Sequence, residues 1–176
     1  MARVHLRLVE DCAKPCSETC NCSIKPDCAG PIEQEMKQHF SQQLDLCNQL
    51  EAIADALPQK FDTQRLLVIA RSIFPTVKTA HHFEENRIFP HIRVEAASKA
   101  DLNLSLERLQ YEHWEDESFA EEVSEGLIKF VSDAERPSPD TLAYMLRGFF
   151  EGLRRHIAFE AEHILPLLRQ HELGHH

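Results

Sequence analysis

Four histidines, each set among apolar residues at helical spacing, are the residues of this chain best suited to chemistry. His39 and His81 are separated by 42 residues, and His113 and His156 by 43, so the second half of the chain repeats the first. Each has an apolar residue seven positions before it, which indicates an apolar helix face. One buried histidine is usually a hydrogen-bonded core residue, but four in matching positions indicate a shared site.

Two of these histidines, in the second and fourth positions of the repeat, are followed by a glutamate four positions later in closely similar stretches. The pairs are His81 with Glu85 and His156 with Glu160, in the stretches HHFEENRIFP and HIAFEAEHILP. Residues four apart lie on one face of a helix, so both side chains of a pair can point at the same place. The spacing alone is a weak signal in a chain with 11 histidines, so the apolar surroundings carry the argument.

Burying such a set of side chains without partners is costly. Each unpaired buried charge costs several kcal/mol even after the protein relaxes. Contacts between the glutamates and histidines offset part of this cost, whereas metal ions satisfy all of the groups at once. Two metals sharing two bridging carboxylates fit best, and imidazole with carboxylate ligands suits iron, manganese or zinc. The sequence therefore predicts a two-metal site.

The earlier of the two histidine–glutamate pairs has an ambiguous register. From the histidine to the proline that follows is nine residues in the earlier stretch and ten in the later one. One residue has thus been lost from the earlier stretch. We expect His81 with Glu85, because that pair keeps the spacing of four, but His82 and Glu84 remain as alternatives.

Two more residues lie close to this pattern in the sequence. Glu117 follows His113 by four positions. Three alternatives are open for it: a residue that touches the site, a residue behind a ligand, or a surface residue. His163 follows His156 by seven, so it is a candidate to support a ligand or to join the ligand set.

Four amphipathic stretches must position these residues. Apolar periodicity and the breaks at Pro58 and ERPSPD predict four helices, over residues 31–57, 62–97, 102–131 and 141–172. Helices of this length with short connections favour an all-α fold, an antiparallel up-down-up-down four-helix bundle. We therefore expect a cysteine-rich extension over residues 1–30 and the bundle over residues 31–172.

The chain from Ile32 to Leu168 resembles a hemerythrin-like (HHE cation-binding) domain. The resemblance rests on one histidine in each of the first and third helices and on H-x3-E, an apolar pair and proline in the second and fourth. It implies a non-haem di-iron centre inside a four-helix bundle, with terminal histidines and two glutamates that bridge the irons together with an oxo or hydroxo group. Carried onto this chain, the implied metal ligands are His39, His81, Glu85, His113, His156 and Glu160.

Glu117 departs from one branch of that family. Oxygen-carrying hemerythrins have a second histidine at this place in the third helix, and this chain has a glutamate. The departure argues against a reversible oxygen carrier. The ligand set is more similar to the family members that repair iron centres after nitrosative or oxidative stress, and to bacterial hemerythrin-like sensors.

Composition argues against several classes of protein. The formal net charge of −10 disfavours a nucleic-acid or anionic-membrane partner, because the long-range field would repel both. The chain has no run of about 18 apolar residues, so no membrane span is expected. The N-terminal residues lack an apolar core of secretory-signal length, which makes a cytoplasmic location the expectation.

Five of the six cysteines crowd into the N-terminal segment. In a reducing cytosol such a cluster points to metal or redox chemistry more than to disulfides. Its spacing matches no zinc or iron–sulfur pattern, so an oxidisable tail and a loose metal-holding or redox-sensing segment are both open. These residues are Cys12, Cys16, Cys20, Cys22 and Cys28.

The leading hypothesis is a non-haem di-iron protein that handles or senses oxygen, nitric oxide or peroxide, or that supplies iron in a stress response. Its expected cofactor is two iron ions, with zinc or manganese as alternatives, and its expected partner is a small diatomic ligand or peroxide. One alternative is a metal-dependent regulatory or interaction module that signals through the cysteine-rich tail. Another is a bundle with structural zinc or manganese. Six protein ligands for two metals leave coordination positions open, which permits catalysis without establishing it.

Overall fold

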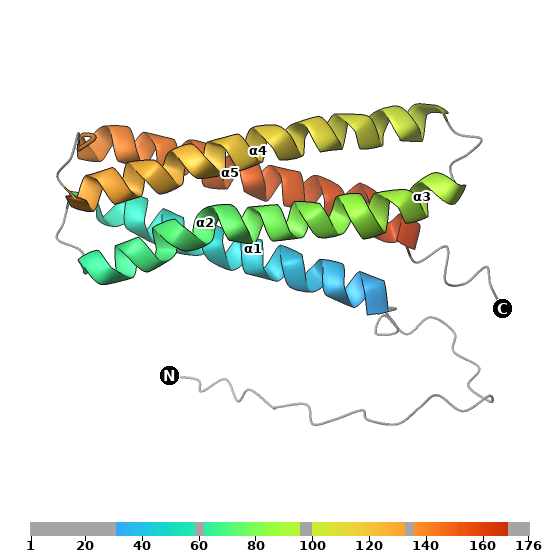
Figure 1. The fold of residues 1–176 in the computed structure, drawn as a ribbon, viewed down its shortest axis with the longest axis horizontal. Coiled ribbons are helices and arrows are strands. Elements are labelled where there is room, and N and C mark those ends of the chain that lie inside the picture. The colour runs from blue at the N-terminus through green and yellow to red at the C-terminus, as the bar shows by residue number, and fades with distance from the viewer. Residues whose placement is uncertain (1–30, 59–61, 96–99, 133–135, 169–176) are drawn as a thin grey trace, which may run out of the picture.

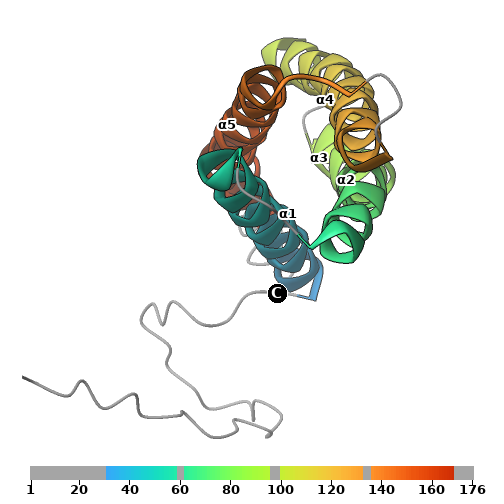
Figure 2. The ribbon, with the colours of Figure 1, turned by 90° about the vertical axis from the view of Figure 1, so that its left-hand side faces the viewer.

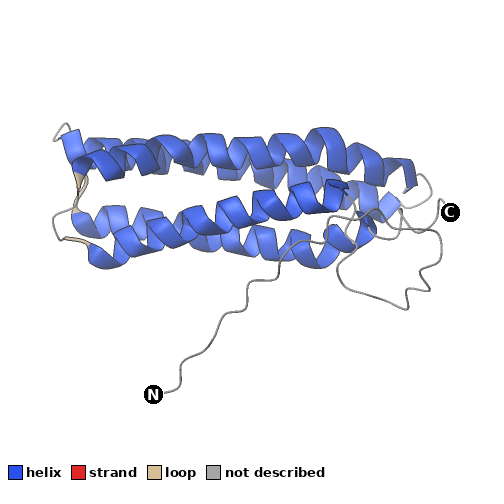
Figure 3. Ribbon diagram, turned by 90° about the horizontal axis from the view of Figure 1, so that it is seen from below, coloured by secondary structure: helices blue, strands red, loops and turns tan. Residues whose placement is uncertain are grey.

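Four long helices form an antiparallel bundle in the computed structural model, which describes residues 31–58, 62–95, 100–132 and 136–168 (Figure 1). The long helices are α1 (Pro31–Ala56), α2 (Thr63–Phe83), α4 (Ala100–Ser132) and α5 (Pro139–His163). Between α2 and α4 the chain continues through a π-helical turn, η1 (Glu84–Ile88), and a short helix, α3 (Phe89–Glu95). The described residues contain no strand (Figure 3). The prediction of an all-α four-helix bundle is confirmed.

The helices stand in a ring around one core, as the end-on view in Figure 2 shows. Helix α1 packs against α2 and α5, and α4 packs against the same two helices. Each helix therefore turns one face towards a shared interior. That interior is closely filled by apolar side chains from all four, among them the fully buried Leu50, Ile73, Leu127 and Leu146. None of the described helices is both long and apolar enough to cross a membrane.

Local sequence explains where two of the helices begin. The Asp62 side chain accepts hydrogen bonds from the backbone N–H of Gln64 at 2.9 Å and of Arg65 at 3.4 Å, which caps α2. Ser138 likewise accepts a bond from the N–H of Thr141 at 3.0 Å and caps α5. These caps satisfy amide groups that every helix start leaves without a partner inside the helix.

The second predicted helix changes type partway along its length. At Glu84 the α-helix gives way to the π turn, in which the N–H of Phe89 donates to the carbonyl of Glu84, five residues back. A π turn accommodates one extra residue and changes the direction in which the side chains around it point. Pro90, two positions after the end of the turn, has no amide hydrogen with which to close a regular α-helical bond.

The fourth predicted helix is interrupted near its end. Helix α5 stops at His163, Ile164 forms a turn, and residues 165–168 are helical again. Pro166, which cannot donate a backbone hydrogen bond, lies in this last stretch. The rest of the prediction, residues 169–172, lies outside the described residues, as do residues 1–30 with their five cysteines.

Cys47 lies inside the bundle. Its side chain is fully buried, and its thiol lies 3.7 Å from the backbone carbonyl of Phe150, to which it donates a weak hydrogen bond. Burial raises the pKa of Cys47 to about 11, although nearby Arg154 acts in the opposite direction. The reactive thiolate form is therefore scarce near neutral pH.

We predict that Cys47 resists alkylation in the folded protein. Iodoacetamide at mildly alkaline pH should leave the Cys47 peptide unmodified until the protein is unfolded, because only unfolding exposes the thiol and restores its ordinary pKa. Mass spectrometry of that peptide measures the reaction separately from the other cysteines. Rapid modification of Cys47 in the folded chain would contradict its buried position.

Candidate metal centre

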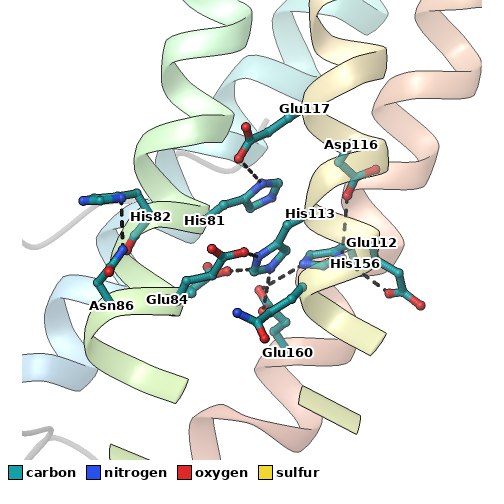
Figure 4. A network of polar contacts seen from close by, with 12 residues as sticks. His81, His82, Glu84, Asn86, Glu112, His113, Asp116, Glu117, His156 and Glu160 are labelled. Carbon is teal, nitrogen blue, oxygen red and sulfur yellow. Dashed lines mark hydrogen bonds and ion pairs between the residues drawn. The ribbon is translucent and has the colours of Figure 1, made fainter. Parts of the chain in front are cut away.

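Ionisable side chains gather at one place inside the bundle. His81 comes from α2, Glu84 from η1, His113 from α4, and His156 and Glu160 from α5 (Figure 4). None of the five is more than 7 % exposed, and both carboxylates are fully buried. Three sides of the bundle thus direct polar groups to one point in a largely apolar core. These five residues are called the buried cluster below.

The side chains of the buried cluster face a common centre. The Nε2 atom of His113 lies 3.1 Å from Oε2 of Glu84 and 3.8 Å from Oε1 of Glu160. The Nε2 atom of His156 lies 3.6 Å from the other Glu160 oxygen. The rings of His81 and His113 are stacked, with 4.0 Å between their centroids and 6° between their planes.

Eight polar atoms of the buried cluster have no hydrogen bond of good geometry. They are both ring nitrogens of His81, the Nε2 atoms of His113 and His156, and the four carboxylate oxygens of the two glutamates. Buried polar atoms are nearly always hydrogen-bonded in folded proteins, since leaving them unpaired is costly. Two groups of potential ligand atoms each lie within 4.8 Å of one another: His81, His113 and His156 in one, and Glu84, His113, His156 and Glu160 in the other. This donor set fits metal ions, which would satisfy the carboxylate oxygens and one nitrogen of each ring together.

Without a metal, the surroundings of the cluster set which groups are charged. Burial, reinforced by His113 and His156, lowers the pKa of His81 to about 2 and keeps its ring neutral. Burial and the neighbouring Glu160 raise the pKa of Glu84 well above its ordinary value. Burial opposes the charged forms of His113 and Glu160 too, but the polar contacts that His113 makes with both glutamates raise its pKa to about 10. Contacts with His113 and His156 lower the pKa of Glu160 despite burial. A metal ion must therefore displace protons when it binds.

The structure brings together four of the six residues predicted as ligands, namely His81, His113, His156 and Glu160. The fifth place is taken by Glu84, the alternative that the ambiguous register left open. Glu84 is fully buried, whereas the side chain of Glu85 is 34 % exposed and reaches the cluster from outside. Metal binding by these residues stays a prediction, and the geometry favours Glu84 over Glu85 as a ligand.

The distance to the proline is the signal that could have identified Glu84. Glu84 precedes Pro90 by six residues, and Glu160 precedes Pro166 by six. The two glutamates therefore match when the stretches are aligned from their prolines, and the missing residue falls between histidine and glutamate. Counting forward from the histidine selects Glu85 instead.

His39, the ligand predicted on α1, is not among the residues of the buried cluster. It is half-buried, and its ring centroid lies 4.8 Å from that of Phe83. Burial lowers the pKa of His39, and Glu35 partly offsets this effect. Helix α1 also buries Gln43, whose amide oxygen has no hydrogen-bond partner. Sequence reasoning did not identify Gln43, because a single glutamine forms part of no recognisable pattern.

The remaining candidates lie around the buried cluster or away from it. His82 points outward, with its Nδ1 atom 3.0 Å from the amide nitrogen of Asn86 (Figure 4). His163 is exposed and packs against Phe159, with 4.5 Å between ring centroids. Glu117 is partly exposed, and its Oε1 atom lies 3.4 Å from Nδ1 of His81. Of these three, Glu117 is the one in contact with the cluster.

A cavity of about 590 Å³ opens beside the buried cluster, between α4 and α5. Glu112 and Asp116 line it from α4, and Gly152 and Phe159 line it from α5. His156 forms part of its wall. The cavity therefore leads from the bundle surface to one of the histidines of the cluster.

We predict that Glu84→Gln and Glu160→Gln each weaken metal binding by more than ~100-fold, since even residues behind a ligand cost ~10–100-fold when changed. Glu85→Gln should keep the metal content of the unchanged protein, because no oxygen of Glu85 is among the buried atoms that lack a hydrogen-bond partner. Plasma mass spectrometry after reconstitution and desalting measures the metal per chain. Loss of metal in Glu85→Gln, with retention in Glu84→Gln, would restore Glu85 as the ligand.

Comparison with known protein families agrees with this geometry. Residues 31–168, which are 138 of the 176 residues, match the model of the hemerythrin HHE cation-binding domain. No curated protein and no solved structure gives a match. The matched segment contains all four long helices and every residue of the buried cluster. The chain therefore belongs to the hemerythrin HHE cation-binding domain family, and its fold is a metal-binding four-helix bundle.

Proposed function

We propose that this protein holds two iron ions in the buried cluster and through them handles or senses oxygen, nitric oxide or peroxide, or supplies iron in a stress response. One observation carries the proposal: eight nitrogen and oxygen atoms of the buried cluster lack hydrogen-bond partners. Apolar side chains of similar size would stabilise a metal-free bundle at least as well as this set does. The polar set is therefore best explained by the ions that it would bind.

Five residues would hold the metals: His81, Glu84, His113, His156 and Glu160. Each carboxylate has two oxygens and can bridge two metals, while each imidazole binds one. His39 stays a predicted sixth ligand. A mixed nitrogen and oxygen donor set suits iron, manganese and zinc, and iron, when bound, supplies one-electron chemistry and open positions for small molecules.

The chain's own residues keep one side of the cluster apolar and leave another side accessible. Val77, one turn before His81, and Ile88, one turn after Glu84, are both fully buried. The ring of Phe89 stacks beside His113, with 5.5 Å between their centroids. These side chains exclude bulk water from the cluster, which strengthens electrostatic interactions inside it. The cavity between α4 and α5 offers the route by which a small molecule or ion reaches His156.

Metal analysis combined with absorption spectroscopy tests the proposal. The full chain, stripped with a chelator and reconstituted anaerobically with ferrous iron, should take up two irons, because two carboxylates can be shared by two ions. On exposure to oxygen it should develop near-ultraviolet charge-transfer bands. Protein that binds no iron and shows no such bands would contradict the proposal. Protein that takes up zinc or manganese but not iron would instead support a structural metal.

We predict that Gly152→Leu slows metal loading several-fold without changing the amount of metal bound. The new side chain would enter the cavity, and the helix accepts it because the nearest atom to an added Cβ is an Arg155 guanidinium nitrogen at 4.0 Å. Stopped-flow absorption with a chromophoric zinc chelator measures the loading rate.

Ala158→Leu is the matched control, since Ala158 is exposed on the same helix and does not line the cavity. Its loading rate should equal that of the unchanged protein. Equal rates in the two variants would contradict the cavity as the access route.

A further inference from the structure

A carboxylate lies behind every histidine of the buried cluster, on the side away from its centre. Glu85 places Oε1 2.9 Å from Nδ1 of His113, and Glu117 places Oε1 3.4 Å from Nδ1 of His81. Asp116 approaches Nδ1 of the third histidine, His156, to 3.6 Å. In His113 and His156 the other nitrogen, Nε2, is the buried nitrogen without a hydrogen-bond partner, whereas in His81 both nitrogens lack one.

The two nitrogens of an imidazole ring have complementary roles. In a neutral ring one nitrogen carries the proton and the other carries the lone pair that binds a metal. A carboxylate beside Nδ1 accepts the Nδ1–H hydrogen bond and thereby places the lone pair on Nε2. The hydrogen bond with Glu85 would therefore direct the lone pair of His113 into the buried cluster, and the longer approaches of Glu117 and Asp116 would favour the same arrangement in His81 and His156. Figure 4 shows the Glu117 contact on one side of the cluster and the Asp116 contact on another.

Exposure separates these outer carboxylates from the two inside the cluster. The side chains of Glu85, Glu117 and Asp116 are 34 %, 27 % and 20 % exposed, whereas those of Glu84 and Glu160 are fully buried. Water therefore solvates the outer carboxylates in part. An ionised carboxylate is the stronger hydrogen-bond acceptor.

Each outer carboxylate also acts across a helix boundary. Glu85 of η1 contacts a histidine of α4, Glu117 of α4 contacts a histidine of α2, and Asp116 of α4 contacts a histidine of α5. A histidine held from a neighbouring helix keeps its ring orientation even when its own helix shifts slightly. Glu112 lies near the last of these histidines as well, at 3.7 Å, but its other oxygen is bound to Arg108 at 2.8 Å.

We propose that Glu85 is the positioning residue for His113, and Glu117 for His81, each fixing the tautomer and ring orientation that present Nε2 to a metal. This inference rests on the proposed function, because it assigns the residues that support the same site. Glu85 makes a contact of hydrogen-bond length, so it has the larger effect. Glu117 has the smaller one, because its oxygen lies 3.4 Å from Nδ1 of His81 and makes no hydrogen bond of good geometry with it.

Zinc binding to the full chain tests this inference, since zinc is diamagnetic and has no redox chemistry. Glu85→Ala, which removes the acceptor, should weaken zinc binding ~10–100-fold at unchanged stoichiometry. Glu85→Gln keeps an acceptor oxygen and should bind zinc within a few-fold of the unchanged protein. Glu117→Ala should weaken binding less than Glu85→Ala, and Glu121→Ala, at an exposed position of α4, should have no effect.

Long-range proton–nitrogen NMR of the zinc-loaded protein reads the tautomers directly. We expect Nε2-bound, Nδ1-protonated rings for His113 and His81, and a loss of the protected Nδ1–H signal of His113 in Glu85→Ala but not in Glu85→Gln. A general loss of structure would alter all the histidine signals and the circular dichroism of every variant, which a positioning role does not require.

Three results would overturn the inference. They are Nδ1-bound rings, unchanged affinity in Glu85→Ala, and a lower zinc stoichiometry in Glu85→Gln, which would make Glu85 a ligand. Unchanged protein that binds no metal of any kind would instead contradict the proposed function, and this inference would fall with it. The two failures are therefore distinguishable.

Discussion

The free-energy cost of burying ionisable groups in an apolar bundle is the constraint on which the rest of this structure depends. Three imidazoles and two carboxylates are almost fully buried, and eight of their atoms find no hydrogen-bond partner in the protein. Pairing among themselves relieves only part of that cost, as the opposed pKa shifts of Glu84 and Glu160 show. Bound cations would balance the negative charge of the carboxylates and accept the unused lone pairs. The need to satisfy these buried groups therefore links the bundle to metal binding.

The π turn is the local feature that lets the backbone meet this requirement. It begins at Glu84, follows α2 directly and ends two positions before Pro90. Irregular helical turns of this kind store strain and occur often at functional sites. Here the turn gives its two adjacent glutamates different surroundings. Glu84 faces the cluster, and Glu85 reaches the outer nitrogen of a histidine on α4. Adjacent residues of the same type thus acquire different environments from the backbone alone.

Much of the fold and part of the site follow from the sequence pattern. Apolar periodicity gives the four helices within a few residues, because burial of one helix face dominates their stability. The repeat of histidines about 75 residues apart identifies three of the buried histidines, and H-x3-E identifies Glu160. The choice between Glu84 and Glu85 could not be made by counting in α-helical turns, since the π turn changes the facing of residues locally. His39 is half-buried and packs against Phe83. Residue spacing in the sequence does not predict such a contact.

Anomalous X-ray diffraction from crystals of the iron-loaded protein, recorded at the iron absorption edge, tests the central claim most directly. The account predicts two anomalous peaks inside the bundle, both within coordination distance of Glu84 and Glu160, with Nε2 of the buried histidines as the nearest nitrogen atoms. Peaks at other places, or no peak between these two glutamates in crystals shown to contain iron, would contradict it.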